Sequence, residues 1–143
     1  SLVKTISLLL AILNLCFLSY FLHTIQNNHT LLDVGVGSSF FTIPMAEVTS
    51  GKIYAMDPDS RMLSVIDDKA KEKGLNNIEL IQDYIENISL QNNSIDFVMA
   101  SLILHEVISL TKALSNIFEL LKTEGHLLCL EFEKDDLIFL YDN

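Results

Sequence analysis

The sequence predicts an α/β domain built on a mostly parallel β-sheet. From residue 30 onward, short runs rich in Val, Ile and Leu alternate with segments of helical periodicity. The strand candidates are apolar at nearly every position, which is the pattern of strands covered by helices on both faces. The chain has 143 residues, of which 50% are hydrophobic and 20% are charged. This is enough for one domain with a single core.

Strands and helices are expected in alternation along this part of the chain. The expected strands cover 30–34, 52–56, 78–81, 95–102 and 127–132. The expected helices cover 40–48, 60–73 and 110–121. Asp59 is suited to cap the start of the second helix, and Gly74 is suited to end it. Gly125 is expected to end the third helix in the same way.

The charge and the cysteines exclude several classes of function. A net charge of −10 argues against a nucleic-acid groove on this chain, because phosphate binding needs clustered Lys and Arg. Cys16 and Cys129 belong to no CxxC pair and no His-rich cluster. Neither a metal site nor a disulfide framework is therefore expected. Buried reduced thiols are typical of a cytoplasmic protein.

The first 28 residues are expected to form a unit separate from the domain at 29–143. Residues 6–22, ISLLLAILNLCFLSYFL, are almost entirely apolar. Their polar interruptions do not share one helical face, which excludes an amphipathic surface helix. A run of ~17 residues is at the short edge of what spans a bilayer. Three interpretations remain: a helix packed on this domain or on a partner, a membrane anchor, and a cleaved signal peptide.

Glycines and acids stand at the ends of three expected strands, where ligands of parallel α/β sheets bind. Gly35 and Gly37 follow the first strand, and they let the backbone turn tightly and approach a ligand closely. Asp57 ends the second strand, 22 residues after Gly35, where an acid can accept hydrogen bonds from both ribose hydroxyls. Asp83 ends the third strand and could accept from the exocyclic amine of a purine. These strand ends outline a site for an adenosine-containing ligand.

The glycine segment does not match the phosphate-binding motifs. A dinucleotide fingerprint needs G-x-G-x-x-G, and the position of its third glycine holds Phe40. A P-loop needs G-x-x-x-x-G-K-[ST], which the sequence lacks. A dehydrogenase of related fold is therefore disfavoured. S-adenosylmethionine, which contains adenosine but no phosphate, is favoured as the ligand.

Five segments resemble, in order and spacing, the motifs of class I S-adenosylmethionine-dependent methyltransferases. They are LLDVGVGSSFFTIPMAE (31–47), KIYAMDPDSRML (52–63), IELIQD (78–83), NNSIDFVMASLILHEV (92–107) and ALSNIFELLKTEGHLLCLEFEK (113–134). The resemblance extends to the small proteins related to the ubiquinone/menaquinone biosynthesis methyltransferases. It implies a Rossmann-like three-layer sandwich with about five strands in the order 3-2-1-4-5. It also implies methyl transfer from S-adenosylmethionine to a small-molecule acceptor.

The resemblance implies roles for individual residues. The residues that it implies for cofactor binding are Asp33, Gly35, Gly37, Asp57, Pro58, Met62, Asp83, Tyr84 and Ser101. Asp33, Gly35 and Gly37 would line the methionine portion, and Asp57 would hold the ribose. The adenine would be surrounded by Pro58, Met62, Asp83 and Tyr84, and Ser101 would lie near the sulfonium. For Asp33, a cap for nearby backbone amides is an equal alternative to a cofactor contact.

The cofactor supplies the reactivity of a methyl transfer, while the protein orients the reactants and keeps the pocket dry. A base is needed only if the acceptor atom must lose a proton. His105 and Glu106, just after the fourth strand, are the candidates for this role. In the alternative interpretation, His105 packs between a strand and a helix, and Glu106 faces solvent.

Two departures from the family pattern suggest a second function. Ser39 stands at the usual third glycine of the first motif, and its Cβ would lie where the backbone approaches the cofactor. Family members continue through a sixth and a seventh strand, whereas DDLIFLYDN (135–143) could supply at most a short helix or an edge strand. An exposed sheet edge would favour a homodimer. The alternative is therefore a degenerate, non-catalytic relative that binds the cofactor weakly or serves as a scaffold.

Overall fold

The structure is a computed structural model that describes residues 19, 22–36, 41–101, 107–130 and 138–142. The strands are β1 (Leu31–Val34), β2 (Ile53–Met56), β3 (Ile78–Ile81), β4 (Ile95–Ser101), β5 (Leu121–Leu130) and β6 (Ile138–Asp142). The helices are α2 (Thr42–Val48), α3 (Ser60–Glu72), the short 3-10 helix η1 (Ile85–Asn87) and α4 (Leu110–Leu120). Strands and helices alternate as the sequence predicts.

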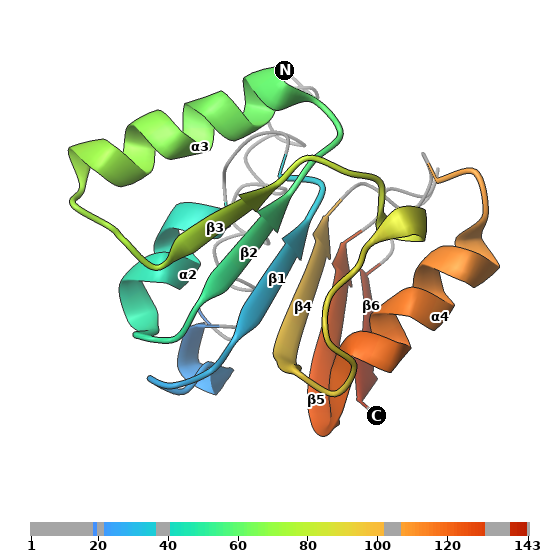
Figure 1. Cartoon of the computed structure of the whole chain (residues 1–143). Coiled ribbons are helices and arrows are strands. Elements are labelled where there is room, and N and C mark those ends of the chain that lie inside the picture. The colour runs from blue at the N-terminus through green and yellow to red at the C-terminus, as the bar shows by residue number, and fades with distance from the viewer. Residues whose placement is uncertain (1–18, 20–21, 37–40, 102–106, 131–137, 143) are drawn as a thin grey trace, which may run out of the picture.

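All six strands belong to one sheet, in the order β3-β2-β1-β4-β5-β6. β1 to β5 are parallel, and β6 runs antiparallel to β5. The predicted order 3-2-1-4-5 is confirmed, and Ile138–Asp142 form an edge strand. β1 pairs with β2 on one side and with β4 on the other, and the strand order reverses between β1 and β4 (Figure 1).

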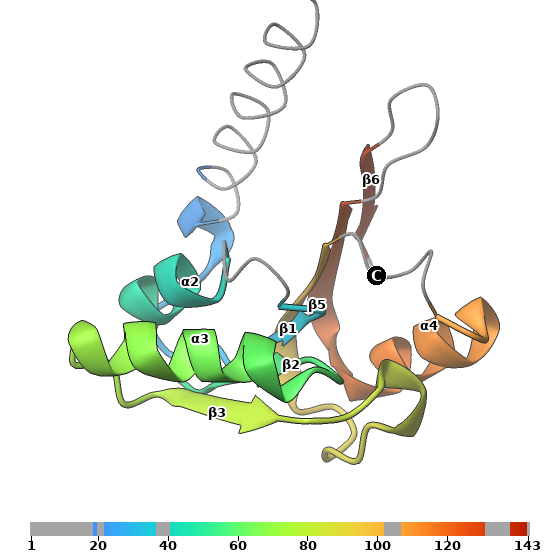
Figure 2. The same cartoon turned by 90° about the horizontal axis from the view of Figure 1, so that it is seen from above.

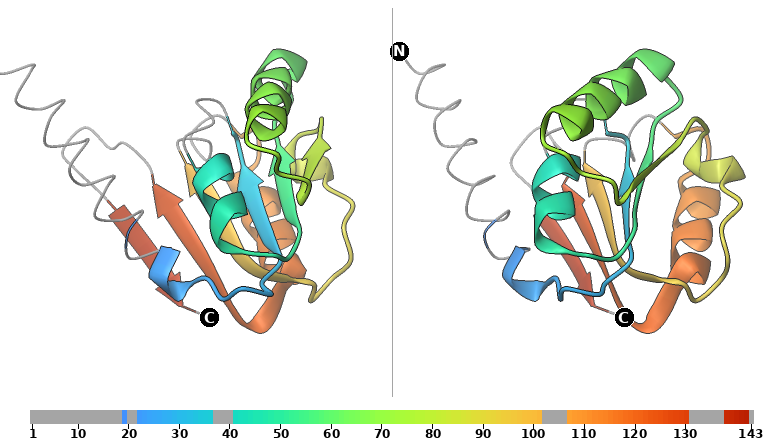
Figure 3. Two further views of the ribbon diagram at one scale, coloured as in Figure 1. Left: turned by 90° about the vertical axis from the view of Figure 1, so that its left-hand side faces the viewer. Right: turned by 60° about the vertical axis from the view of Figure 1, so that its left-hand side comes forward.

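Helices cover both faces of the sheet, which confirms the three-layer sandwich. α2 and α3 lie together on one face, and α4 lies on the other (Figure 2). The two views of Figure 3 show the same separation from the side. α2 connects β1 to β2, and α3 connects β2 to β3. Each helix returns the chain along one face of the sheet, so that the next strand can run parallel to the last.

The core lies on both faces of β1, which is buried at every position. Leu32 joins a cluster with Ala113 and Ile117 of α4. Its neighbour Leu31 points the other way and joins a cluster with Met45 of α2. Because successive side chains of a strand alternate between faces, a strand with helices on both sides must be apolar throughout. This is the physical reason for the unbroken apolar runs in the sequence.

The two predicted ends of α3 are confirmed. The Asp59 carboxylate accepts a hydrogen bond from the backbone N–H of Arg61 at 2.9 Å, as an N-cap does. At the other end, Gly74 has a φ of +66°, and the N–H of Leu75 donates to the carbonyl oxygen of Ala70 at 2.9 Å. A left-handed residue followed by this long bond is the termination that glycine favours.

The prediction that Gly125 ends the third helix is wrong. α4 ends at Leu120, and the chain enters β5 directly, with Leu121 in an extended conformation. Gly125 lies inside β5, where a Cβ atom would be 2.9 Å from the carbonyl oxygen of Lys122 and 3.2 Å from that of Ile95. The glycine therefore serves both a tight local path of the β5 backbone and the close approach of β5 to β4, in the region where their register shifts.

Most of the apolar run at 6–22 lies outside the described residues, so the division of the chain at residue 28 stays a prediction. Residues 22–24 are helical, and Ile25 is buried in the cluster that also contains Met45. Among the helices of the described ranges, none is long and apolar enough to cross a membrane. β6 pairs along β5, so the edge expected at the fifth strand is covered. Homodimer formation stays a prediction.

Candidate functional site

A pocket lies at the carboxyl ends of β1, β2 and β3. Its lining residues among those described are Val34, Gly35, Met56, Pro58, Asp83, Tyr84, Ile85, Glu86 and Val107. Four of them, Gly35, Pro58, Asp83 and Tyr84, are residues that the resemblance implies for cofactor binding. The pocket is therefore at the edge of the sheet where ligands of this fold class bind.

Gly35 shapes the wall contributed by β1. Its φ is +74°, a left-handed conformation that strains any residue with a Cβ atom. The turn lets the N–H groups of Gly35 and Val36 both donate to the carbonyl oxygen of Met56, at 2.9 and 3.2 Å. The chain leaving β1 is thereby fixed against the end of β2.

Asp57 is held rigidly at the end of β2. Its side chain is buried, and its Oδ1 atom accepts a hydrogen bond from the N–H of Asp59 at 2.8 Å. Its own N–H donates to the carbonyl oxygen of Ile81 at 3.1 Å. Pro58, the next residue, lines the pocket. The carboxylate is thus anchored beside the pocket by the turn that leads into α3.

Asp33 lies one residue before the pocket wall and is almost completely buried, at 2% exposure. Its Oδ2 atom accepts a hydrogen bond from the Thr42 hydroxyl at 2.5 Å. Burial raises the pKa of Asp33 to about 7, the bond from Thr42 opposes the rise, and the negative charge of Asp57 adds to it. Asp33 is not among the lining residues of the pocket, and its carboxylate bonds to the side-chain hydroxyl of Thr42, so it does not cap the backbone of α2.

Asp83 and Tyr84 form the wall contributed by β3. The Oδ1 atom of Asp83 accepts from the N–H of Tyr84 at 2.7 Å and from the Asn87 side chain at 3.5 Å. Among the described residues, the Oδ2 atom accepts no further hydrogen bond. The Tyr84 side chain is 58% exposed at the pocket mouth. A carboxylate oxygen and an aromatic ring are thus available to a ligand on this side.

Two residues that the sequence did not indicate as functional tie this wall to α4 and to the segment before it. The Asn116 amide donates to the carbonyl oxygens of Ile85 and Glu86, at 2.9 and 3.0 Å. The Glu86 carboxylate accepts from the N–H of Ile108 at 2.8 Å. Asn116 lies at the border of the apolar face that Ala113, Ile117 and Leu120 form. A half-buried polar residue at such a border does not indicate which element it contacts, so the sequence did not predict its role.

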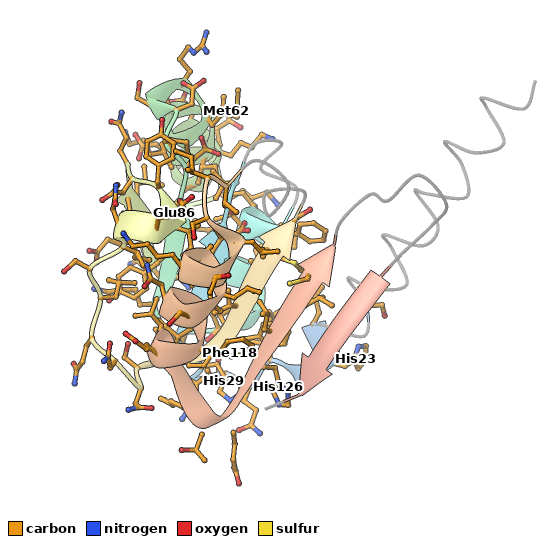
Figure 4. The ribbon with its side chains drawn as sticks, turned by 90° about the vertical axis from the view of Figure 1, so that its right-hand side faces the viewer. His23, His29, Met62, Glu86, Phe118 and His126 are labelled. Atoms are coloured by element: carbon orange, nitrogen blue, oxygen red, sulfur yellow. The ribbon has the colours of Figure 1, made fainter. Side chains whose placement is uncertain are left out.

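Other predicted site residues lie elsewhere or outside the described residues. Met62 is half-buried in the first turn of α3 and packs against the cluster around Leu63, and Ser101 is half-buried at the end of β4. Neither lines the pocket. Figure 4 shows Met62 and Glu86 toward the same end of the molecule, away from His29 and Phe118. Gly37, His105 and Glu106 lie outside the described residues.

The lining of the pocket indicates which ligands suit it. Its walls include apolar side chains, and its charged members among the described residues are Asp83 and Glu86. With acids and no described Lys or Arg in the wall, the pocket is unsuited to phosphate and suited to a neutral or cationic ligand. The described residues contain no group of His, Cys, Asp and Glu that could hold a metal ion.

The fold and the position of the pocket define a class: a Rossmann-like α/β domain with its pocket beside the reversal of strand order. Comparison of sequences then gives the family. Residues 25–140 match the family described as a methyltransferase domain. This chain therefore belongs to the methyltransferase-domain family, which confirms the resemblance seen in its motifs.

Individual relatives agree with this assignment. A demethylmenaquinone methyltransferase of Geobacillus sp. (strain WCH70) is 33% identical over 116 residues, which are 80% of this chain and 50% of that protein. A ubiquinone/menaquinone biosynthesis C-methyltransferase of Pasteurella multocida is 32% identical over 113 residues, 77% of this chain and 42% of that protein. The chain thus spans about half the length of the relatives it matches.

Solved structures show the same fold. A SAM-dependent methyltransferase from Aquifex aeolicus superposes with a TM-score of 0.70 at 26% sequence identity. The superposition covers 78% of this chain and 61% of that one. The arrangement of the sheet and its helices is therefore that of a methyltransferase domain.

Proposed function

We propose that this chain binds S-adenosylmethionine and forms the cofactor-binding part of an enzyme that methylates a small molecule. The observation that carries the proposal is the meeting of Gly35, Pro58 and Asp83, from three neighbouring strand ends, around one pocket. Asp57 is not among the lining residues, but it directly precedes Pro58 and is anchored by the N–H of Asp59. The family assignment and the names of the relatives point in the same direction.

The residues present fit the adenosine part of this cofactor. Asp57 would accept hydrogen bonds from the ribose hydroxyls, because its carboxylate is fixed at the end of β2. Asp83 would accept from the adenine amine, with Tyr84 and the apolar wall against the ring. Gly35 would let the backbone approach the cofactor without a Cβ atom in the way. When bound, the cofactor supplies an electrophilic methyl group on a positively charged sulfur.

For the acceptor, we propose a small molecule of the quinone kind. The support is the names of the relatives, which are methyltransferases for demethylmenaquinone and for ubiquinone and menaquinone biosynthesis. The roles of Met62 and Ser101 beside the cofactor stay proposals, as do those of Gly37, and of His105 and Glu106 as bases.

The test is calorimetric titration of the full chain with S-adenosylmethionine and S-adenosylhomocysteine. Asp57→Asn keeps the bond to the Asp59 amide but weakens the acceptor for ribose, so both ligands should bind about tenfold more weakly or worse. Asp68→Asn removes the same charge from an exposed position on α3 and should leave both affinities unchanged. A folded wild-type chain that binds neither ligand would contradict the proposal.

A transfer assay separates the enzyme from its non-catalytic alternative. The full chain is incubated with cofactor carrying a labelled methyl group and with a demethylated quinol, and the label in the quinol is counted. Incorporation supports the enzyme. Cofactor binding without incorporation supports a relative that has kept the site and lost the reaction.

A further inference from the structure

A buried hydrogen bond joins β1 to the first residue of α2, next to the pocket. The Thr42 hydroxyl, at 0% exposure, donates to the Asp33 carboxylate at 2.5 Å. Asp33 is followed by Val34 and Gly35, which both line the pocket. A change in the position or charge of the Asp33 carboxyl is therefore transmitted over one or two residues to the pocket wall.

The surroundings of Asp33 offer its carboxylate no positive charge among the described residues, so the Thr42 hydroxyl matters for its ionisation. The residues facing it across the sheet are Ala55 on β2 and Met99 on β4, which carry no charge. The charged group acting on it among the described residues is Asp57, another acid. The group of α2 that contacts the Asp33 carboxylate is the Thr42 hydroxyl, which does not titrate. In the described part of the chain, Thr42 is thus the donor that stabilises the ionised Asp33 side chain.

We infer that Thr42 is a positioning residue for the cofactor pocket, and that it acts by holding the ionised carboxyl of Asp33 beside the wall that receives a cationic ligand. The inference rests on the proposed function, because S-adenosylmethionine is the cationic ligand in question.

A pH dependence follows from linkage. A positive charge in the pocket favours the ionised form of Asp33, so the ionised form must in turn favour the positive ligand. Because burial raises the pKa of Asp33 to about 7, the affinity for S-adenosylmethionine should rise with pH between about 6 and 8. S-adenosylhomocysteine lacks the positive sulfur, so its affinity should rise less.

The variants Thr42→Val and Thr42→Ser test the hydroxyl. Valine has nearly the same shape but cannot donate, so the pKa of Asp33 should rise further, and the binding profile should move to higher pH. At pH 7, S-adenosylmethionine should bind about tenfold more weakly. Serine keeps the donor and should restore the wild-type profile. Calorimetry at several pH values gives the affinities, and carbon NMR of the Asp33 carboxyl follows its titration.

Thr49→Val is the matched control. Thr49 is also buried, and its hydroxyl donates to the carbonyl oxygens of Asn27 and His29, at 3.0 and 2.9 Å. It follows α2 and bonds to the segment that enters β1 at its amino end, whereas the pocket lies at the carboxyl ends of the strands. Its loss should lower the melting temperature and leave the pH profile of binding in place.

The outcomes are distinct. If Thr42→Val only lowers the melting temperature, as the control does, while the binding profile and the Asp33 titration stay unchanged, the inference is wrong and the proposed function stands. If the folded wild-type chain binds neither ligand, the proposed function fails as well. Should Thr42→Val not fold, Asp33→Asn decides: a flat pH profile supports the inference, and an unchanged rise with pH overturns it.

Discussion

Asp33 illustrates at the scale of one residue how a fold can hold an acid in an unfavourable place. The side chain lies on a strand that is buried on both faces, and burial raises its pKa from 3.8 to about 7. Between these two values, the folded chain keeps a proton that the unfolded chain releases. The free energy of unfolding therefore falls as the pH rises from about 4 to about 7.

Asp33→Asn should remove this dependence. We expect the variant to gain stability relative to wild type as the pH is raised from 4 to 7, by on the order of 2–4 kcal/mol. Above pH 7 the difference should be constant. Urea unfolding at a series of pH values measures it. A difference that stays constant across the whole range would show that Asp33 titrates normally in the folded chain.

Several site residues could be predicted singly, because their signals are local. Gly35, Asp57 and Asp83 each follow directly on an apolar strand, and a strand end in a parallel sheet is a known position for ligands. Thr42 and Asn116 could not be predicted in their roles. Each acts by a hydrogen bond to another element, and the local sequence does not indicate which element its side chain contacts.

At the scale of elements, Asn77 holds the connections between helices and strands at the amino end of the sheet. Its side-chain amide donates to the carbonyl oxygens of Ala46, Thr49 and Gly51, at 3.1, 2.9 and 3.1 Å. These belong to α2 and to the turn that follows it, whereas Asn77 directly precedes β3. One side chain thereby satisfies three carbonyl groups of a neighbouring connection.

Asn77→Asp should be strongly destabilising. The change replaces the donor by a carboxylate oxygen, which faces three carbonyl oxygens and repels them, at a cost of about 2–4 kcal/mol. The neighbouring exposed Asn76 provides the control, because Asn76→Asp introduces the same charge in solvent. Urea unfolding of the two variants makes the comparison. Equal losses would mean that the added charge, rather than the lost donor, is responsible.

The elements themselves were largely predictable from apolar periodicity and caps. α3 begins at the predicted cap and ends at the predicted glycine, because both signals act within a few residues. Gly125 has the local pattern of a helix stop, because a glycine after an apolar stripe commonly ends a helix. In the structure a Cβ atom at this position would crowd the carbonyl oxygens of Lys122 and of Ile95 on β4. That contact becomes visible only when the pairing of the strands is known.

At the scale of the whole molecule, the sheet is most protected at its centre. β1 is buried throughout and pairs with strands on both sides, and β4 is likewise flanked by β1 and β5. β3 lies at one edge and none of its residues is fully buried. Local opening should therefore begin at β3 and leave β1 and β4 to the last.

Hydrogen exchange followed by mass spectrometry tests this order. Peptides from β1 and β4 should exchange most slowly, and those from β3 should exchange roughly a hundredfold faster under native conditions. The helical peptides of α3 serve as an internal reference. Equal protection of β1 and β3 would show that the sheet opens as one cooperative unit.

The sequence by itself determined the α/β class, the sites of the first four strands, and the placing of a glycine and two acids at strand ends. Hydrophobic burial and backbone geometry act over a few residues, so they leave a readable local pattern. Only the tertiary structure decided that Thr42 bonds to Asp33, that Asn116 fastens η1 to α4, and that β6 completes the sheet. Such contacts join residues of different elements, so they depend on how the elements pack against one another, and the sequence of one segment does not specify that packing.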